Sequence, residues 1–113
     1  MGTIFCDIDG TILRYPKDWK DLSVESADLL PGSFEQLKAW QAEGKTIVLT
    51  TSRPESLRAI TEAQLAKFNI GYHHLICGLA PGNRILVNDR KNNQDTAFAI
   101  NLDRDSGIPS MNT

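Results

Sequence analysis

The chain has little of what would assign it to several large classes of protein. Two cysteines in 113 residues are too few for a disulfide-rich secreted scaffold. No apolar run approaches the roughly 20 residues of a membrane span, and the N-terminus lacks the charged and then apolar pattern of a secretory signal. Twelve basic and fourteen acidic residues leave a net charge of -2. This balance gives no electrostatic reason to expect a nucleic acid or a membrane as partner.

The two cysteines and the overall composition point to one cytoplasmic domain. Cys6 and Cys77 both lie in apolar, strand-like runs, where buried free thiols are expected. Free thiols fit the reducing cytosol. A length of 113 residues with 41% hydrophobic residues is enough for one domain, residues 1–113, built around a single core.

Apolar runs of two kinds alternate along the chain. Short β-branched runs predict strands at residues 3–8, 46–50, 74–77, 84–87 and 97–100. Helical spacing predicts a helix from Ser33 to Gly44 and another from Ser52 or Pro54 to Asn69. Strands that alternate with helices form βαβ units, so we expect a small three-layer, Rossmann-like α/β domain with a mainly parallel sheet of about five strands.

Two segments have no clear period. Residues 12–30 mix proline, aromatic residues and scattered charges, which favours a loop or flap with a short helical turn. Its Tyr15 and Trp19 are candidates for a substrate contact, although a structural role is favoured. Residues 104–113 are expected to form a frayed tail.

The first strand leads directly into two carboxylates. Asp7 and Asp9 are one residue apart and are followed by Gly10 and Thr11. Because residues i and i+2 of a strand point the same way, both carboxylates should converge at its carboxyl end, where open α/β sheets bind ligands. Two close anions are costly, and a divalent cation is the simplest remedy. Oxygen ligands of this kind suit Mg²⁺.

Two later strands also end in polar residues. The second expected strand runs into Thr50, Thr51 and Ser52 before a helix, where hydroxyl and N–H groups can hold a phosphate. Taken alone, this pattern is more often a helix cap. The fourth runs into Asn88 and Asp89, which could supply a third metal ligand or simply form a turn.

Together, in this order, the three strand ends resemble the haloacid-dehalogenase-like (HAD) superfamily of phosphohydrolases. Residues 7–11, Asp-Ile-Asp-Gly-Thr, match that family's first motif in full. Thr51 matches the second motif, with Thr50 as the alternative register, and Asn88-Asp89 match the acidic fourth motif. The resemblance covers residues 3 to about 102.

The resemblance implies a set of roles. Asp7 would be the nucleophile that forms an aspartyl-phosphate, and Asp9 the general acid and base. Gly10 and Thr51 would bind the phosphoryl group. Asp7, Asp9 and Asp89 would hold Mg²⁺, with Asn88 supporting Asp89.

The family's usual basic group between the third and fourth strands is hard to place. Arg84 is in the right stretch of sequence, but it begins the expected fourth strand, which would put it ~13 Å from the catalytic edge. Lys91 and Arg53 both lie at the correct edge. We prefer Lys91, because Arg53 has the alternative of pairing with Glu55 or Asp89.

The gaps between these motifs are too short for a separate cap domain, so the site should be open. Selectivity would then come from the flap, from a large substrate or from a neighbouring subunit of a homo-oligomer, and we prefer the last because dry sites strengthen electrostatic catalysis. We expect a magnesium-dependent phosphohydrolase acting on a small phosphomonoester, with a sugar or sugar-acid phosphate as the default. The alternative is a non-catalytic HAD-like domain that binds phosphate or a partner.

Overall fold

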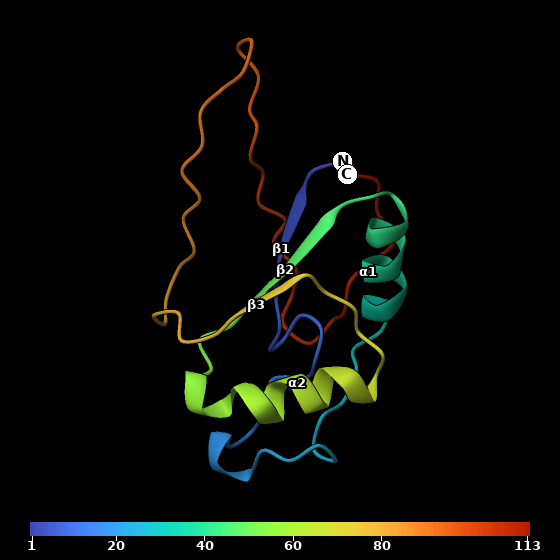
Figure 1. Cartoon of the computed structure of the whole chain (residues 1–113), viewed down its shortest axis with the longest axis vertical. Coiled ribbons are helices and arrows are strands. Elements are labelled where there is room, and N and C mark those ends of the chain that lie inside the picture. The colour runs from blue at the N-terminus through green and yellow to red at the C-terminus, as the bar shows by residue number, and fades with distance from the viewer.

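Three of the β-branched runs form the sheet. In the computed structural model, which describes residues 1–113, β1 (Thr3–Asp7), β2 (Thr46–Thr50) and β3 (His74–Ile76) pair in parallel in the order β1-β2-β3 (Figure 1). The register places Asp7 opposite Thr50, and Thr50 opposite Ile76. The polar residues that come after β1 and β2 therefore meet at one edge of the sheet.

Two ten-residue helices connect these strands. α1 (Ser33–Ala42) and α2 (Arg58–Lys67) lie where the 3.6-residue period predicts them, and α2 is preceded by the 3₁₀ turn η2 (Glu55–Leu57). α1 is followed by Gly44, whose φ of 84° fits the left-handed turn that often ends a helix. Both helices are too short to cross a membrane.

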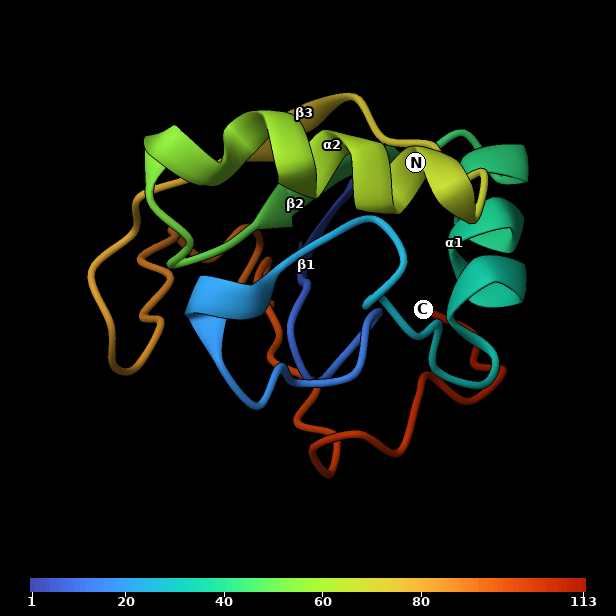
Figure 2. The same cartoon turned by 90° about the horizontal axis from the view of Figure 1, so that it is seen from below.

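The core lies on one face of the sheet. Successive βαβ crossovers in the same direction place their helices on the same side. Accordingly, Leu37 and Trp40 of α1 and Leu65 of α2 share one buried cluster with the inward residues of the strands, namely Cys6, Ile47, Leu49 and Leu75. Figure 2 shows α2 lying beside β2 and β3. On the opposite face Phe5 and Ile76 remain 57% and 42% exposed.

The flap expected at residues 12–30 is a loop closed on itself with one short helical turn, η1 (Trp19–Asp21). Main-chain hydrogen bonds join Arg14 to Asp28 and Leu30 to Ile12 at its base. Its middle packs along α2, because the main-chain oxygen of Ser23 accepts a hydrogen bond from Gln64 Nε2. The flap thus has a fixed position beside the carboxyl end of β1.

The prediction of about five strands and three layers is wrong in number. Residues 84–87 and 97–100 form no strand of the sheet. They belong instead to a projection, residues 83–100, which we call the arm. It leaves the body after β3, extends along the long axis and returns to the body near residue 101 (Figure 1). The broader prediction of a small α/β domain with a parallel sheet is confirmed.

The expected frayed tail at residues 104–113 is also not observed. Ile108 is buried in the core cluster, and its N–H donates to the main-chain oxygen of Pro31 at 3.0 Å. Gln36 exchanges two hydrogen bonds with the main chain of Met111, and Trp40 Nε1 donates to Thr113 Oγ1. The end of the chain therefore covers α1 and its N-terminal turn.

Candidate functional site

The turn after β1 places its two carboxylates. Ile8 is fully buried, and its main-chain oxygen accepts hydrogen bonds from the N–H groups of Thr11, Ile12 and Leu13. The tight reversal requires a positive φ at Gly10, 84°, which glycine adopts without strain. Asp7 and Asp9 are thereby held at the edge of the sheet where β2 also ends.

A cavity of about 470 Å³ lies at this edge. Asp7, Asp9 and Gly10 contribute from the first turn, and Thr51 and Ser52 from the end of β2. The flap adds Tyr15 and Trp19, whose rings meet edge to face. Arg84 and Arg104, from the base of the arm and from the C-terminal segment, complete the polar wall. The cavity thus combines two carboxylates with two guanidinium groups.

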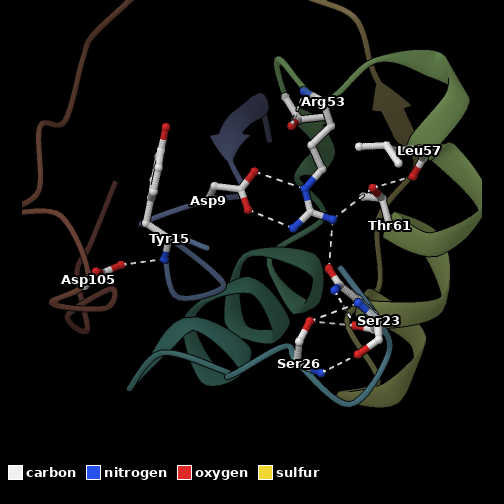
Figure 3. A network of polar contacts seen from close by, with 10 residues as sticks. Asp9, Tyr15, Ser23, Ser26, Arg53, Leu57, Thr61 and Asp105 are labelled. Carbon is white, nitrogen blue, oxygen red and sulfur yellow. Dashed lines mark hydrogen bonds and ion pairs between the residues drawn. The ribbon is translucent and has the colours of Figure 1, made fainter. Parts of the chain in front are cut away.

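Asp9 is held by a buried ion pair. Arg53 Nη2 donates to Asp9 Oδ1 at 2.8 Å and Arg53 Nε to Oδ2 at 3.1 Å, in the two-pronged arrangement shown in Figure 3. The side chains of Arg53 and Asp9 are only 2% and 8% exposed. Pairing of Arg53 with Glu55 or Asp89, the alternative drawn from the sequence, is wrong, since Arg53 pairs with Asp9.

The remaining donors of Arg53 are also satisfied. Its Nη1 donates to Thr61 Oγ1 and to Gln64 Oε1, both on the buried side of α2 (Figure 3). The ring of Trp19 lies 5.7 Å from the guanidinium carbon, a distance at which a cation and an aromatic ring attract each other. One arginine therefore links the turn after β1, α2 and the flap.

Asp7 has a different environment. Its side chain is 50% exposed, and the nearest cation is Arg84 Nη2 at 3.8 Å from Oδ1. Partial burial raises the pKa of Asp7 above its usual value; Arg84 lowers it in part and Asp9 raises it again. Asp7 is thus an accessible carboxylate whose negative charge is incompletely compensated.

The structure changes the choice of basic residue. The sequence argued against Arg84, because a fourth strand would place it far from the catalytic edge. That placement is wrong, and Arg84 lines the cavity beside Asp7. Lys91 lies instead at the exposed end of the arm, next to the turn that reverses it. Within one chain, the structure does not bring Lys91 to the cavity.

Asp89 also lies on the arm and does not join Asp7 and Asp9. No group of three or more acidic, histidine or cysteine side chains has the geometry to hold a metal ion within the chain. Asp7 fits Mg²⁺ as an accessible oxygen ligand. The main-chain oxygen of Asp9 is a second candidate ligand, because no backbone N–H of the turns and loops donates to it. The Asp9 carboxylate is occupied by Arg53.

Thr51 lies in the cavity wall but is almost fully buried, and its Oγ1 accepts a hydrogen bond from the N–H of Arg53. Thr51 therefore closes a local turn and caps no helix, since η2 begins after Pro54 and has no side-chain cap. The neighbouring Ser52 is exposed and also lines the cavity. Thr50, the alternative register, has its hydroxyl 3.5 Å from the main-chain oxygen of Cys6.

Arg104 is a cavity residue that sequence reasoning missed. It stacks on Tyr15, with 4.1 Å between the guanidinium carbon and the ring centre. Next to it, Asp105 accepts a hydrogen bond from the Tyr15 N–H and donates its own N–H to the Gly10 oxygen (Figure 3). The signal that could have pointed here is the charged run Asp103-Arg104-Asp105, which lies in the supposed tail.

Comparisons with known proteins find similar structures. No protein-family model matches the chain, and no curated protein matches it. Two solved chains of the Pnkp1/Rnl/Hen1 RNA repair complex are similar, each at 28% identity over 67% of this chain, with TM-scores of 0.60 and 0.61. The chain spans only 25% and 27% of their lengths. A crystallised Vibrio cholerae protein is similar at 19% identity, with a TM-score of 0.57 over 79% of this chain and 80% of that one.

Proposed function

We propose that the chain is a magnesium-dependent phosphohydrolase of the HAD-like type, which cleaves a phosphomonoester through an aspartyl-phosphate on Asp7. The observation that carries this proposal is the state of Asp7. It is an accessible carboxylate in a polar cavity, next to a guanidinium group, at the end of the first strand of a parallel sheet. The Asp-Ile-Asp-Gly-Thr sequence around it supports the same chemistry.

Asp7 would attack the phosphorus atom, and the bond from phosphorus to the leaving oxygen would break. Arg84 and Arg104 face the same cavity and can neutralise the phosphoryl oxygens as the new bond forms. Bound Mg²⁺ would supply further charge neutralisation, held by Asp7 and the main-chain oxygen of Asp9. Tyr15 and Trp19 form the side of the cavity against which the rest of a substrate would lie.

Asp9 would protonate the leaving oxygen and then accept a proton from the water that attacks the phosphorus atom of the aspartyl-phosphate. Each of its oxygens accepts one N–H group of Arg53 and keeps a second lone pair that can take up the proton. In this proposal Arg53 is a positioning residue, which fixes the direction of the Asp9 carboxylate.

The substrate class within this chemistry is a proposal of its own. A sugar or sugar-acid phosphate is our default, because similar capless proteins act in such pathways. The likeness to chains of an RNA repair complex favours a second candidate, a phosphate at the end of a polynucleotide. A panel that contains both sugar phosphates and an oligonucleotide with a terminal phosphate separates the two.

Hydrolysis of p-nitrophenyl phosphate with and without Mg²⁺ tests the proposed reaction. We expect turnover that depends on Mg²⁺ and that Asp7→Asn abolishes. Asp28→Asn is the matched control, because it makes the same chemical change at an acid that is 71% exposed on the flap. If neither p-nitrophenyl phosphate nor any member of the panel is hydrolysed, the alternative of a non-catalytic phosphate-binding domain replaces the enzyme.

A further inference from the structure

The C-terminal segment places a guanidinium group in the cavity without a partner of opposite charge. Arg104 lines the cavity and is exposed, yet none of the ion pairs of the chain includes it. Asp103 and Asp105 adjoin it in the sequence but do not pair with it. Arg84, the other arginine of the cavity wall, pairs with Asp7. Arg104 is therefore the arginine of the cavity whose positive charge is free to meet a ligand.

The side chain of Arg104 is held from two sides. A Cβ added at Gly10 would lie 3.0 Å from its Cγ, so the apolar stem of Arg104 occupies the space that a glycine leaves open. Its guanidinium carbon lies 4.1 Å from the centre of the Tyr15 ring, where a cation and a ring attract each other. An arginine stacked in this way keeps its N–H donors for a planar or tetrahedral anion such as a carboxylate or a phosphate.

The main chain next to Arg104 is fixed as well. The N–H of Asp105 donates to the Gly10 oxygen at 2.9 Å, and Asp105 Oδ1 accepts the Tyr15 N–H at 2.8 Å (Figure 3). Asp105 has a φ of 65°, in the left-handed region, where a non-glycine residue persists only if its surroundings hold it. The position of Arg104 thus exists before a ligand binds, which lowers the entropic cost of binding.

Arg104 lies toward the part of a substrate that does not react. Arg84 Nη2 is 3.8 Å from Asp7 Oδ1, so a phosphoryl group attacked by Asp7 comes to lie beside Arg84. Arg104 has no such contact with Asp7 and rests on Tyr15 of the flap. Tyr15 belongs to the side of the cavity where the leaving group of a substrate would lie.

We propose that Arg104 is a specificity residue, which binds a second anionic group of the substrate. This inference rests on the proposed function, since it takes the first anion to be the phosphoryl group that Asp7 attacks. The substrate is then a phosphomonoester whose leaving group carries a carboxylate or a further phosphate. The cavity of about 470 Å³ has the size of a small-molecule site. A neutral sugar phosphate lacks the second anion and binds less tightly.

Isothermal titration calorimetry with phosphonates tests this inference without any turnover, because their bond from phosphorus to carbon resists hydrolysis. The ligands are a series of phosphonocarboxylates and of bisphosphonates of increasing chain length, each compared with the alkylphosphonate of the same length in the presence of Mg²⁺. We expect a doubly anionic member of the series to bind about 10- to 100-fold more tightly than its alkylphosphonate, the range that a hydrogen bond between charged groups supplies. The series that shows the advantage identifies the second anion as a carboxylate or as a phosphate.

Three variants assign the advantage to Arg104. Arg104→Gln should remove it and change the affinity for alkylphosphonates much less. Arg104→Lys, which keeps the charge but loses the planar fork, should retain part of it. Arg90→Gln is the matched control, because it removes the same charge from an exposed pair on the arm, and it should leave both affinities unchanged.

Equal affinities of all matched ligands for the wild-type chain overturn the proposal, and so does the absence of binding by every phosphonate. An Arg104→Gln chain that loses affinity for both kinds of ligand to the same degree also overturns it, because Arg104 then acts on the phosphoryl oxygens alone or supports the segment. Failure of the proposed function gives a different result. A chain that prefers the doubly anionic ligand through Arg104 but hydrolyses no phosphomonoester keeps the second-anion site and is not a phosphohydrolase.

Discussion

At the scale of single residues, Asp7 and Asp9 show how two identical side chains acquire different properties. They are separated by one residue, yet Asp9 is buried and held by two hydrogen bonds from Arg53, whereas Asp7 is half exposed and 3.8 Å from its nearest cation. In the proposed reaction this difference separates the nucleophile, Asp7, from the proton-transfer group, Asp9. Arg53 is the residue that creates it.

Arg53→Met should destabilise the chain by about 3–5 kcal/mol, because it leaves the buried Asp9 carboxylate without its partner. Urea unfolding followed by circular dichroism measures this change. Arg14→Gln is the control, because Arg14 and Asp28 form a longer, exposed pair whose loss should have almost no effect. A loss below about 1 kcal/mol for Arg53→Met would show that the buried pair is not as tightly held as the structure indicates.

Cys6 should be chemically silent in the folded chain. Burial, together with the smaller effect of the neighbouring Asp7, raises the pKa of its thiol to about 12. In a Cys77→Ser background, we expect Cys6 to react with a thiol reagent at pH 8 at least roughly 10²-fold more slowly than in denaturing urea. Equal rates in the two conditions would contradict the burial of Cys6.

The raised pKa of Cys6 also makes the free energy of unfolding depend on pH in the alkaline range. Below the pKa of a free thiol, 9.0, Cys6 carries its proton in both the folded and the unfolded chain and has no effect. As pH rises from 9 toward 12 the unfolded chain loses the proton first, so the free energy of unfolding falls.

Both cysteines are free and buried, which confirms the expectation of buried free thiols drawn from the sequence.

At this scale the sequence could predict which residues follow directly on a strand. It placed Asp7 and Asp9 at the same end of the first strand, although β1 ends at Asp7 and the turn, rather than the pleat, positions Asp9. It could not predict the partner of Arg53 or the position of Arg104, since long side chains reach residues that are distant in sequence. Asp9 and Arg53 are 44 positions apart, and Tyr15 and Asp105 are 90 apart.

At the scale of elements, the local sequence pattern predicted correctly which segments are helices and which are strands in the first 77 residues. It did not predict which strands pair in the sheet. The helices at Ser33 and Arg58 and the first three strands agree with their periodicities. Residues 84–87 have the same β-branched, apolar character, but composition does not say which edge a strand joins. The turn at Asn92 and Asn93 reverses the chain toward the body, but neither limb of the arm pairs with the sheet.

The C-terminal segment gives an element-scale prediction. Gly107 has a φ of 88°, and a Cβ there would overlap the main-chain oxygen of Pro31, the acceptor of the Ile108 N–H. Gly107→Ala should therefore separate the tail from α1. An alanine in the left-handed region costs about 1–2 kcal/mol, and the loss of stability should exceed this amount. Thermal unfolding measures this difference.

Gly44→Ala is the matched control for this prediction. Gly44 has nearly the same φ, 84°, but a Cβ there has no neighbour closer than 4.0 Å. Its substitution should show the backbone cost alone. Equal losses for Gly44→Ala and Gly107→Ala would mean that the contact between the tail and Pro31 contributes nothing to stability.

At the scale of the whole molecule, both helices pack on one face of the sheet and neither covers the other face. The helices and the C-terminal segment all pack on the side of Cys6, Leu49 and Leu75, and the other side carries Phe5 and Ile76. A third layer was expected from the sequence because strands that alternate with helices form βαβ units. In this chain no helix lies on that face, although Val48 at its centre is buried.

The phosphorylated intermediate provides the most direct measurement of the central claim. The chain, mixed with Mg²⁺ and ³²P-labelled acetyl phosphate and quenched in acid, should carry label on the peptide that contains Asp7, and Asp7→Asn should carry none. Label on another residue, or an active enzyme that never becomes labelled under rapid quenching, would contradict the assignment of Asp7 as the phosphoryl acceptor.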